Sequence, residues 1–214
     1  MTHNDGHSIS MTNAVLEALR NDINNCIYES GQFVTEAEIS QKFNVSKTPA
    51  REALNYLCQE GLLDKIPRKG YIVKSLSLAE VLNLFQFRNV LERASVELAV
   101  RYASDQELQA LSELARAELD PAAEDIARQY HDLNNNFHIS VAKLSRNPYL
   151  INALQNVLNL LRRDLFMDMR RNSLEKALEA HVLVAQAMID RDLERALRVT
   201  TDQINVVERR LCIR

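Results

Sequence analysis

Five polar side chains fall at positions that the apolar periodicity of the sequence assigns to helix interiors. Asn134 and His138 lie four residues apart beside the apolar stripe of one predicted helix. Arg88, His181 and Gln203 fall within the apolar stripes of three other predicted helices. A buried polar group without a partner costs roughly 1–3 kcal/mol, and a buried charge costs more. These residues therefore predict either a polar cavity that accepts a ligand or a core network in which they satisfy one another.

A second set of polar side chains lies on the outer face of a predicted helix that ends at Gly61. Its inner face is apolar and its outer face is polar, with Ala50, Ala53, Leu54 and Leu57 inside and Lys47, Thr48, Arg51 and Asn55 outside. Ser46 or Thr48 can cap its start, and Pro49 is tolerated in its first turn. One face of this helix is expected to pack, and the other is free to read DNA.

A basic turn comes after that helix. Residues 62–66 and 71–74 are short strand-like runs, and the sequence Pro67-Arg68-Lys69-Gly70 joins them as a turn. The two cations at the tip of this predicted hairpin suit phosphates or a minor groove. From Lys42 to Lys74 the segment carries a net charge of +4, although the whole chain has a net charge of -3.

Two further helices are expected before this segment. The first covers residues 14–29, where Val15, Leu19, Ile23 and Ile27 recur on one face. The second is opened by Thr35 and Glu38, which have the spacing of a capping box, and runs to Phe43. Helix, helix, recognition helix and hairpin in this order outline a winged helix-turn-helix. It is assigned to residues 11–74, after a flexible arm over residues 1–10.

The remainder of the chain, residues 75–214, is expected to be helical throughout. All four glycines lie in the first 70 residues, and Pro121 and Pro148 are the only prolines after Gly70. Capping-box patterns and Asp-Pro or Asn-Pro pairs mark the helix starts. They predict a bundle of about six helices, which cover residues 77–103, 104–119, 121–145, 148–171, 173–189 and 192–210. The fold class is therefore mostly α, with an N-terminal winged helix-turn-helix and a C-terminal helical bundle.

Composition excludes several other classes of protein. The chain has 214 residues and 46% hydrophobic content, enough for one or two cores. Its three cysteines, Cys26, Cys58 and Cys212, are scattered and lack CxxC spacing, which indicates reduced thiols and a cytoplasmic setting. No apolar run approaches the ~20 residues of a membrane helix.

The residues quoted above resemble the GntR transcription regulators, in the FadR-like branch whose C-terminal half is an all-helical FCD ligand-binding domain. The most specific match is the run from Val45 to Leu54, VSKTPAREAL, followed by EGL at 60–62 and RKG at 68–70. The resemblance implies a regulator that binds a palindromic operator in double-stranded DNA as a homodimer. It implies DNA contacts from Ser46, Lys47, Thr48, Arg51, Arg68, Lys69 and Gly70. Lys47 stands where arginine is commoner, and lysine lacks the rigid fork that binds guanine at two points.

The resemblance to the FCD domain runs through Arg88, Glu92, Phe137-His138, Asn147-Pro148-Tyr149-Leu150 and His181. It implies an effector pocket formed by Arg88, Glu92, Asn134, His138, His181 and Gln203. Typical members bind a divalent metal with one aspartate and three histidines. The matching positions here are Asn134, His138, His181 and Gln203, so only His138 and His181 remain as good donors, and weak metal binding is expected. Arg88 favours an anionic effector, such as a small organic acid.

Two alternatives remain open at this stage. One is a constitutive DNA binder that has lost ligand sensing, because two ligand positions have become neutral amides. The other is a helical-bundle metalloenzyme with an attached binding module. Di-iron bundles need Glu-x-x-His on paired helices, and no such sequence surrounds His131, His138 or His181. No Ser-His-Asp or Cys-His arrangement is evident either, so the chain is not expected to be an enzyme.

Overall fold

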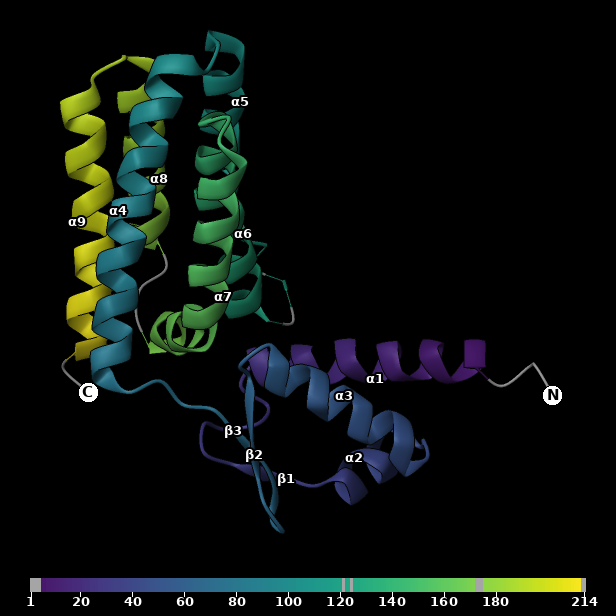
Figure 1. Ribbon diagram of the computed structural model, residues 1–214. Coiled ribbons are helices and arrows are strands. Elements are labelled where there is room, and N and C mark those ends of the chain that lie inside the picture. Colours follow the sequence, from purple (N-terminus) through teal and green to yellow (C-terminus); the bar gives the residue numbers. More distant parts are fainter. Residues whose placement is uncertain (1–4, 121, 124, 172–174, 213–214) are drawn as a thin grey trace. The chain divides into compact units, whose positions relative to one another are not determined.

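The computed structural model describes residues 5–120, 122–123, 125–171 and 175–212 (Figure 1). The chain forms two compact units, Met1–Leu76 and Ser77–Arg214. The sequence had placed this division after residue 74. The fold class predicted from the sequence, a winged helix-turn-helix followed by a helical bundle, is confirmed.

The N-terminal unit contains three helices and three short strands among its described residues. In chain order these are α1 (Asp5–Asn24), β1 (Phe33–Val34), α2 (Glu36–Phe43), α3 (Lys47–Gln59), β2 (Leu63–Ile66) and β3 (Gly70–Val73). Helices α1 and α2 both contact α3, and α3 also contacts β2. The prediction of a flexible arm over residues 1–10 is wrong from Asp5 onward, because α1 begins there. Ile27, expected on the buried face of this helix, lies beyond its end and is exposed.

The turn between α2 and α3 is built from local hydrogen bonds. Thr35 and Glu38 form the predicted capping box at the start of α2. Asn44 ends α2 in the left-handed conformation, with φ 51°, which asparagine tolerates better than most residues. Ser46 occupies the N-cap position of α3, but its side chain makes no capping hydrogen bond. Gly61 lies just after α3 with φ +76°, as the sequence predicts.

The hairpin forms as predicted, and a third strand that the sequence analysis missed completes the sheet. Strand order is β1-β3-β2, and both pairings are antiparallel. Gly70 allows this close pairing, because an added Cβ would lie 2.8 Å from the backbone oxygen of Val34. Gly70 also has φ +108°. The backbone conformation at position 70 therefore requires glycine, whether or not this residue also contacts DNA.

The C-terminal unit contains six helices among its described residues. They are α4 (Leu78–Tyr102), α5 (Asp105–Ala115), α6 (Ile126–Leu144), α7 (Pro148–Arg171), α8 (Glu175–Ile189) and α9 (Leu193–Cys212). Helix α4 lies side by side with α9 and α6 (Figure 1). The described helices include none that is long and apolar enough to cross a membrane.

Most predicted helix starts in this unit are confirmed, and one is wrong. Ser77 with Glu80 and Ser104 with Glu107 form complete capping boxes. The amide nitrogens of Tyr149 and Leu150 donate to Asn147 Oδ1 at the start of α7.

Asp120 does not begin a helix. Its Oδ1 instead accepts from the amide of Ala122 in a turn, and α6 begins at Ile126 with Asp125 as its cap. Helix α5 ends at Ala115, short of the expected Leu119. The predicted start of α8 at Ser173 lies outside the described residues.

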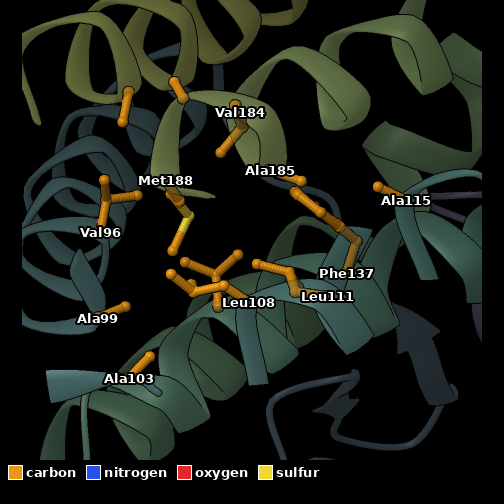
Figure 2. Packing of buried hydrophobic residues seen from close by; sticks show 13 residues of the cluster. Val96, Ala99, Ala103, Leu108, Leu111, Ala115, Phe137, Val184, Ala185 and Met188 are labelled. Atoms are coloured by element: carbon orange, nitrogen blue, oxygen red, sulfur yellow. The ribbon is translucent and has the colours of Figure 1, made fainter. Parts of the chain in front are cut away.

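An apolar core of this unit joins α4, α5, α6, α8 and α9 (Figure 2). Phe137, Leu108 and Met188 fill the space between helices, and alanines such as Ala99 and Ala185 allow the helices to approach closely. The core uses the C-terminal part of α4, whereas Arg88 and Glu92 lie nearer its N-terminus. The polar residues of interest are therefore placed beside this core.

Arginines occupy two helix ends where glycine is usually preferred. Arg146 after α6 has φ 59° and Arg191 after α8 has φ 56°, both left-handed. The Arg191 guanidinium donates to the backbone oxygens of Val100 and Ala103 at 2.6 and 2.9 Å. It also contacts Asp105 Oδ1 at 2.7 Å. Arg191 thereby ties the end of α8 to the connection between α4 and α5.

Candidate functional sites

Helix α3 presents the predicted DNA-reading residues on its outer face. Pro49, Ala50, Ala53, Leu54 and Leu57 are buried on the inner face. Burial of that face leaves the opposite side in solvent, where the structure places Ser46, Lys47, Thr48 and Arg51 as exposed residues. The helix face expected to contact DNA is therefore accessible.

Arg51 is held by a carboxylate that the sequence analysis did not single out. Its Nε lies 2.9 Å from Glu36 Oε1 and 3.0 Å from Glu36 Oε2. The hydrogen bond from Arg51 is the main reason that the pKa of Glu36 is lowered. Because Glu36 engages Nε, the two terminal amino groups of Arg51 remain outside this contact, and these groups can form a fork toward a guanine. The acidic first turn of α2 was the available signal for this pair.

The tip of the β2–β3 hairpin is a tight turn. The amide nitrogen of Lys69 donates to the backbone oxygen of Ile66 at 3.1 Å. Pro67 precedes Arg68, which has φ 65°. That combination corresponds to a type II turn, in which the third position prefers glycine or asparagine. Arg68 holds this position at a cost of about 1–2 kcal/mol, and both Arg68 and Lys69 are exposed.

A cavity of about 560 Å³ lies in the C-terminal unit between α4, α6, α7, α8 and α9. Four of the six residues predicted to bind an effector line it, namely Arg88, Asn134, His138 and Gln203. Glu92 and His181 are buried behind the lining at 4% and 1% exposure. Gln203, expected in the core, is only partly buried. The cavity falls within the 300–1,000 Å³ range typical of small-molecule sites.

Arg88, His138 and Glu92 form a buried hydrogen-bonded triangle beside the cavity. Arg88 Nε donates to Glu92 Oε1 at 2.6 Å, and Arg88 Nη2 lies 3.0 Å from His138 Nε2. His138 Nδ1 lies 2.7 Å from Glu92 Oε2. A guanidinium can only donate, so Nε2 of His138 must accept and its proton must be on Nδ1. His138 is therefore neutral in this arrangement and donates to Glu92.

The triangle fixes the charge of its carboxylate. Burial by itself would raise the pKa of Glu92, but the charge of Arg88 and the hydrogen bonds from His138 and Arg88 outweigh it and lower the pKa. Glu92 is thus ionised at neutral pH and balances the buried Arg88.

His181 has a different environment. It stacks on Phe137 with ring centroids 4.2 Å apart, and its buried Nε2 has no hydrogen-bond partner. Burial lowers the pKa of His181 well below 6.5, so its ring is neutral at pH 7.

The donor set of this region does not fit a tightly held transition metal. The Nε2 lone pair of His138 already accepts a hydrogen bond from Arg88, and the N–H group at Nδ1 donates to Glu92. Asn134 and Gln203 offer only neutral amides. The described residues include no group of three or more histidine, cysteine, aspartate or glutamate side chains that could hold a metal ion. A metal would have to displace Arg88 before it could use His138.

Sequence reasoning missed an ion pair that also lines the cavity. Arg210 binds Asp168 through Nε–Oδ1 at 3.2 Å and Nη2–Oδ2 at 2.6 Å. Asp168 is only 4% exposed. A signal was present, because Asp168 comes three residues after the buried Leu165 and so falls on the inner face of α7. Tyr130 and Asp202 also line the cavity and were not predicted.

Comparisons with known proteins match both units of the chain. Residues 11–73 match the family described as bacterial regulatory proteins, gntR family, and residues 83–205 match the FCD domain. The chain is 30% identical over 164 residues to the Nta operon transcriptional regulator of Aminobacter aminovorans, and the alignment covers 77% of each protein. It is 25% identical over 194 residues to the transcriptional repressor RspR of Escherichia coli, which covers 90% of this chain and 85% of RspR.

Solved structures with the same fold are also found. E. coli McbR/YncC aligns with a TM-score of 0.72 at 19% identity, which covers 94% of this chain and 96% of that one. A protein from Rhodococcus sp. RHA1, described as a GntR transcriptional regulator, aligns with a TM-score of 0.73 at 20% identity, with coverage of 94% and 97%. At these identities the likeness shows the shared fold alone.

Proposed function

Because the chain belongs to the GntR family of bacterial transcriptional regulators and carries an FCD domain, we propose that it binds a palindromic operator as a homodimer and responds to a small carboxylate effector. The family assignment makes it a DNA-binding regulator and not an enzyme. The operator symmetry, the dimer and the effector class are the proposed parts.

The outer face of α3 and the hairpin tip support the DNA-binding part of the proposal. Arg51 is positioned by Glu36 with its terminal amino groups free to contact a base. Arg68 and Lys69 extend the positive charge to the hairpin tip, where phosphate contacts add affinity without sequence preference. One such unit supplies few contacts, and two-fold symmetric proteins read two-fold symmetric sites. These considerations favour a homodimer with two copies of α3.

The observation that carries the effector part is the cavity of about 560 Å³ with Arg88 in its wall. Arg88 is almost fully buried, yet its bonds to Glu92 and His138 use only two of its five N–H groups. Its remaining N–H groups suit a carboxylate, which accepts from arginine in a two-point contact. A cavity of this size with a few polar side chains in its wall favours ligand sensing over the alternative of a constitutive DNA binder.

We propose that metal plays at most a weak part at this site. His138 and His181 are the remaining histidine donors, and Arg88 competes for the lone pair of His138. The effector is then held by the protein's own groups, with Arg88 as the main contact and Asn134 and His138 beside it. Binding to one conformation of the helical unit would change operator affinity by shifting the population of DNA-competent dimers.

The test begins with the full-length protein and a pool of random duplexes. Repeated selection and sequencing should return an inverted repeat, and light scattering should give the mass of a dimer. Small carboxylates are then titrated into the complex with the selected duplex while fluorescence anisotropy reports release. Arg88→Gln should abolish the response, whereas Arg101→Gln, an exposed change on the same helix, should retain it. A selected site without symmetry, or a monomeric protein, would contradict the dimeric part; an acid response that survives Arg88→Gln would contradict the effector part.

A further inference from the structure

The described lining of the cavity carries both positive and negative side chains, and this feature narrows the class of effector. We propose that the effector is dipolar, with a carboxylate bound at Arg88, an ammonium bound on the side of Asp168 and Asp202, and an apolar body between the α7 and α9 walls. An amino acid with an apolar side chain has this chemistry. The inference rests on the proposed function, because it assigns the effector of the same cavity.

The described residues that line the cavity carry as many negative as positive charges. Arg88 and Arg210 line the cavity with positive charge, and Asp168 and Asp202 line it with negative charge. His138 is neutral because Arg88 donates to its Nε2. Glu92 lies behind Arg88 and adds a further negative charge. Among the residues that the structure describes, the lining therefore has no excess of positive charge that would compensate a simple anion. A ligand with both charges adds none, and so avoids the cost of burying an uncompensated charge.

The guanidiniums of Arg88 and Arg210 are already paired with carboxylates. Arg88 holds Glu92 at 2.6 Å, and Arg210 holds Asp168 at 2.6 Å. A carboxylate that binds Arg88 shares it with Glu92, which weakens its net attraction. An ammonium on the same ligand restores the balance, because Asp202 adds a carboxylate acceptor to the lining.

Arg88, Asp168 and Asp202 line the same cavity, whose volume is about 560 Å³. A ligand of amino-acid size that meets Arg88 with its carboxylate therefore shares this cavity with both carboxylates of the lining.

The rest of the lining indicates an apolar body. Leu165 and Met169 come from α7, Leu183 from α8, and Val199 and Val206 from α9. Burial of an aliphatic or aromatic side chain against these residues contributes affinity roughly in proportion to the apolar area removed from water. Asn134 and Gln203 each offer both a donor and an acceptor, which suits a head group that has N–H donors as well as carboxylate oxygens.

The experiment compares ligands of matched shape on the full-length protein by isothermal titration calorimetry. The probes are leucine, methionine and phenylalanine in both enantiomers, each with its counterpart that lacks the amino group and its counterpart that lacks the carboxyl group. For leucine these are 4-methylpentanoate and 3-methylbutylamine. At least one amino acid should bind about ten- to a hundredfold more tightly than both of its counterparts, because each loses one charge-assisted contact.

Two substitutions assign the ammonium contact. Asp202→Asn and Asp168→Asn should each lower the preference for the amino acid over its deaminated acid, and the exposed Asp132→Asn should leave that preference unchanged. The preference is a ratio of two affinities on one variant, so a partial loss of folded protein does not mimic the result. Unchanged preference in both lining variants would overturn the inference.

The possible outcomes separate this inference from the proposed function. If a deaminated acid binds as tightly as its amino acid, the dipolar effector is wrong and the carboxylate effector stands. If the amine alone binds as tightly, both the dipolar inference and the role of Arg88 are wrong. If none of the amino acids binds, the dipolar inference is wrong, and the carboxylate titration of the operator complex decides the proposed function separately.

Discussion

Replacement of Glu92 by glutamine should destabilise the helical unit by about 3 kcal/mol at neutral pH. The Glu92 carboxylate is buried and accepts from both Arg88 and His138. Burial opposes ionisation, but these partners lower the pKa of Glu92 below 4.5. The glutamine variant leaves the charge of Arg88 buried without its carboxylate partner. Removal of one partner of a buried ion pair costs roughly 3–5 kcal/mol.

The lowered pKa of Glu92 also determines how the stability of the helical unit depends on pH. The pKa of Glu92 is lower in the folded state than in the unfolded chain, so its stabilising contribution is fully present above the unfolded value of 4.5. It is lost as the pH falls through the lower pKa of the folded state, where the folded carboxylate becomes protonated. The wild-type protein should therefore lose stability across this window. The glutamine variant should lack this part of the slope.

Urea unfolding followed by far-ultraviolet circular dichroism measures both effects on the full-length chain, which contains no tryptophan. Two units require a fit with two transitions, and the transition of the N-terminal unit serves as an internal reference. Glu97→Gln is the matched control, because Glu97 is exposed on the same helix and should change stability by no more than about 0.5 kcal/mol. Equal stabilities for the two variants, or an unaltered acid slope in Glu92→Gln, would refute the charge balance assigned to the triangle.

Three further predictions concern DNA and metal. In binding titrations, Arg51→Ala should weaken discrimination at one base position by roughly ten- to a hundredfold. Glu36→Gln should lower the ratio of operator affinity to random-duplex affinity. Equal ratios in the wild type and Glu36→Gln would show that Glu36 has no part in base recognition. Lys69→Ala should weaken binding to all duplexes and reduce the slope of log affinity against log salt by about one, so an unchanged slope would remove Lys69 from phosphate contact. Elemental analysis after dialysis should find less than one zinc per chain in the wild type. Arg88→Ala should bind zinc more tightly, because the lone pair of His138 Nε2 no longer accepts from Arg88. Stoichiometric zinc in the wild type would contradict this account.

Much of the N-terminal unit was predictable because its signals are local. The capping box at Thr35, the alternation of Ala50, Leu54 and Leu57 with polar residues, and Gly61 each act over a few residues. Strand β1 was missed because its two residues carry no period of their own. Its pairing depends on the absence of a side chain at Gly70, about 36 positions later in the chain, and no local pattern reveals such a contact.

The cavity was predictable only in part, for a related reason. Periodicity placed Arg88, Asn134 and His138 on inner faces, since helical spacing alone decides that. Periodicity does not determine which inward-facing residues line the cavity. Glu92 and His181 lie behind the lining. Asp168 and Arg210 come from different helices, and their pairing depends on how α7 and α9 pack together.

The start of α6 was misplaced because Asp120-Pro121 carries a sequence signal that also suits a turn. The Asp120 carboxylate accepts from the amide two residues later, a local bond that competes with helix initiation. The capping role passes to Asp125, which has no proline after it and so gave no distinctive signal.

The left-handed arginines at the ends of α6 and α8 have a consequence for the unfolded chain. No residue after Gly70 is glycine, so every residue of the helical unit has its backbone restricted by a Cβ even when unfolded, and less entropy is lost on folding. Arg191→Gly would relieve a strained backbone position, yet it would loosen the unfolded chain and remove the bonds to Val100, Ala103 and Asp105. Glycine, which is common at helix ends, would therefore be destabilising at position 191, and its introduction there is a poor route to a more stable protein.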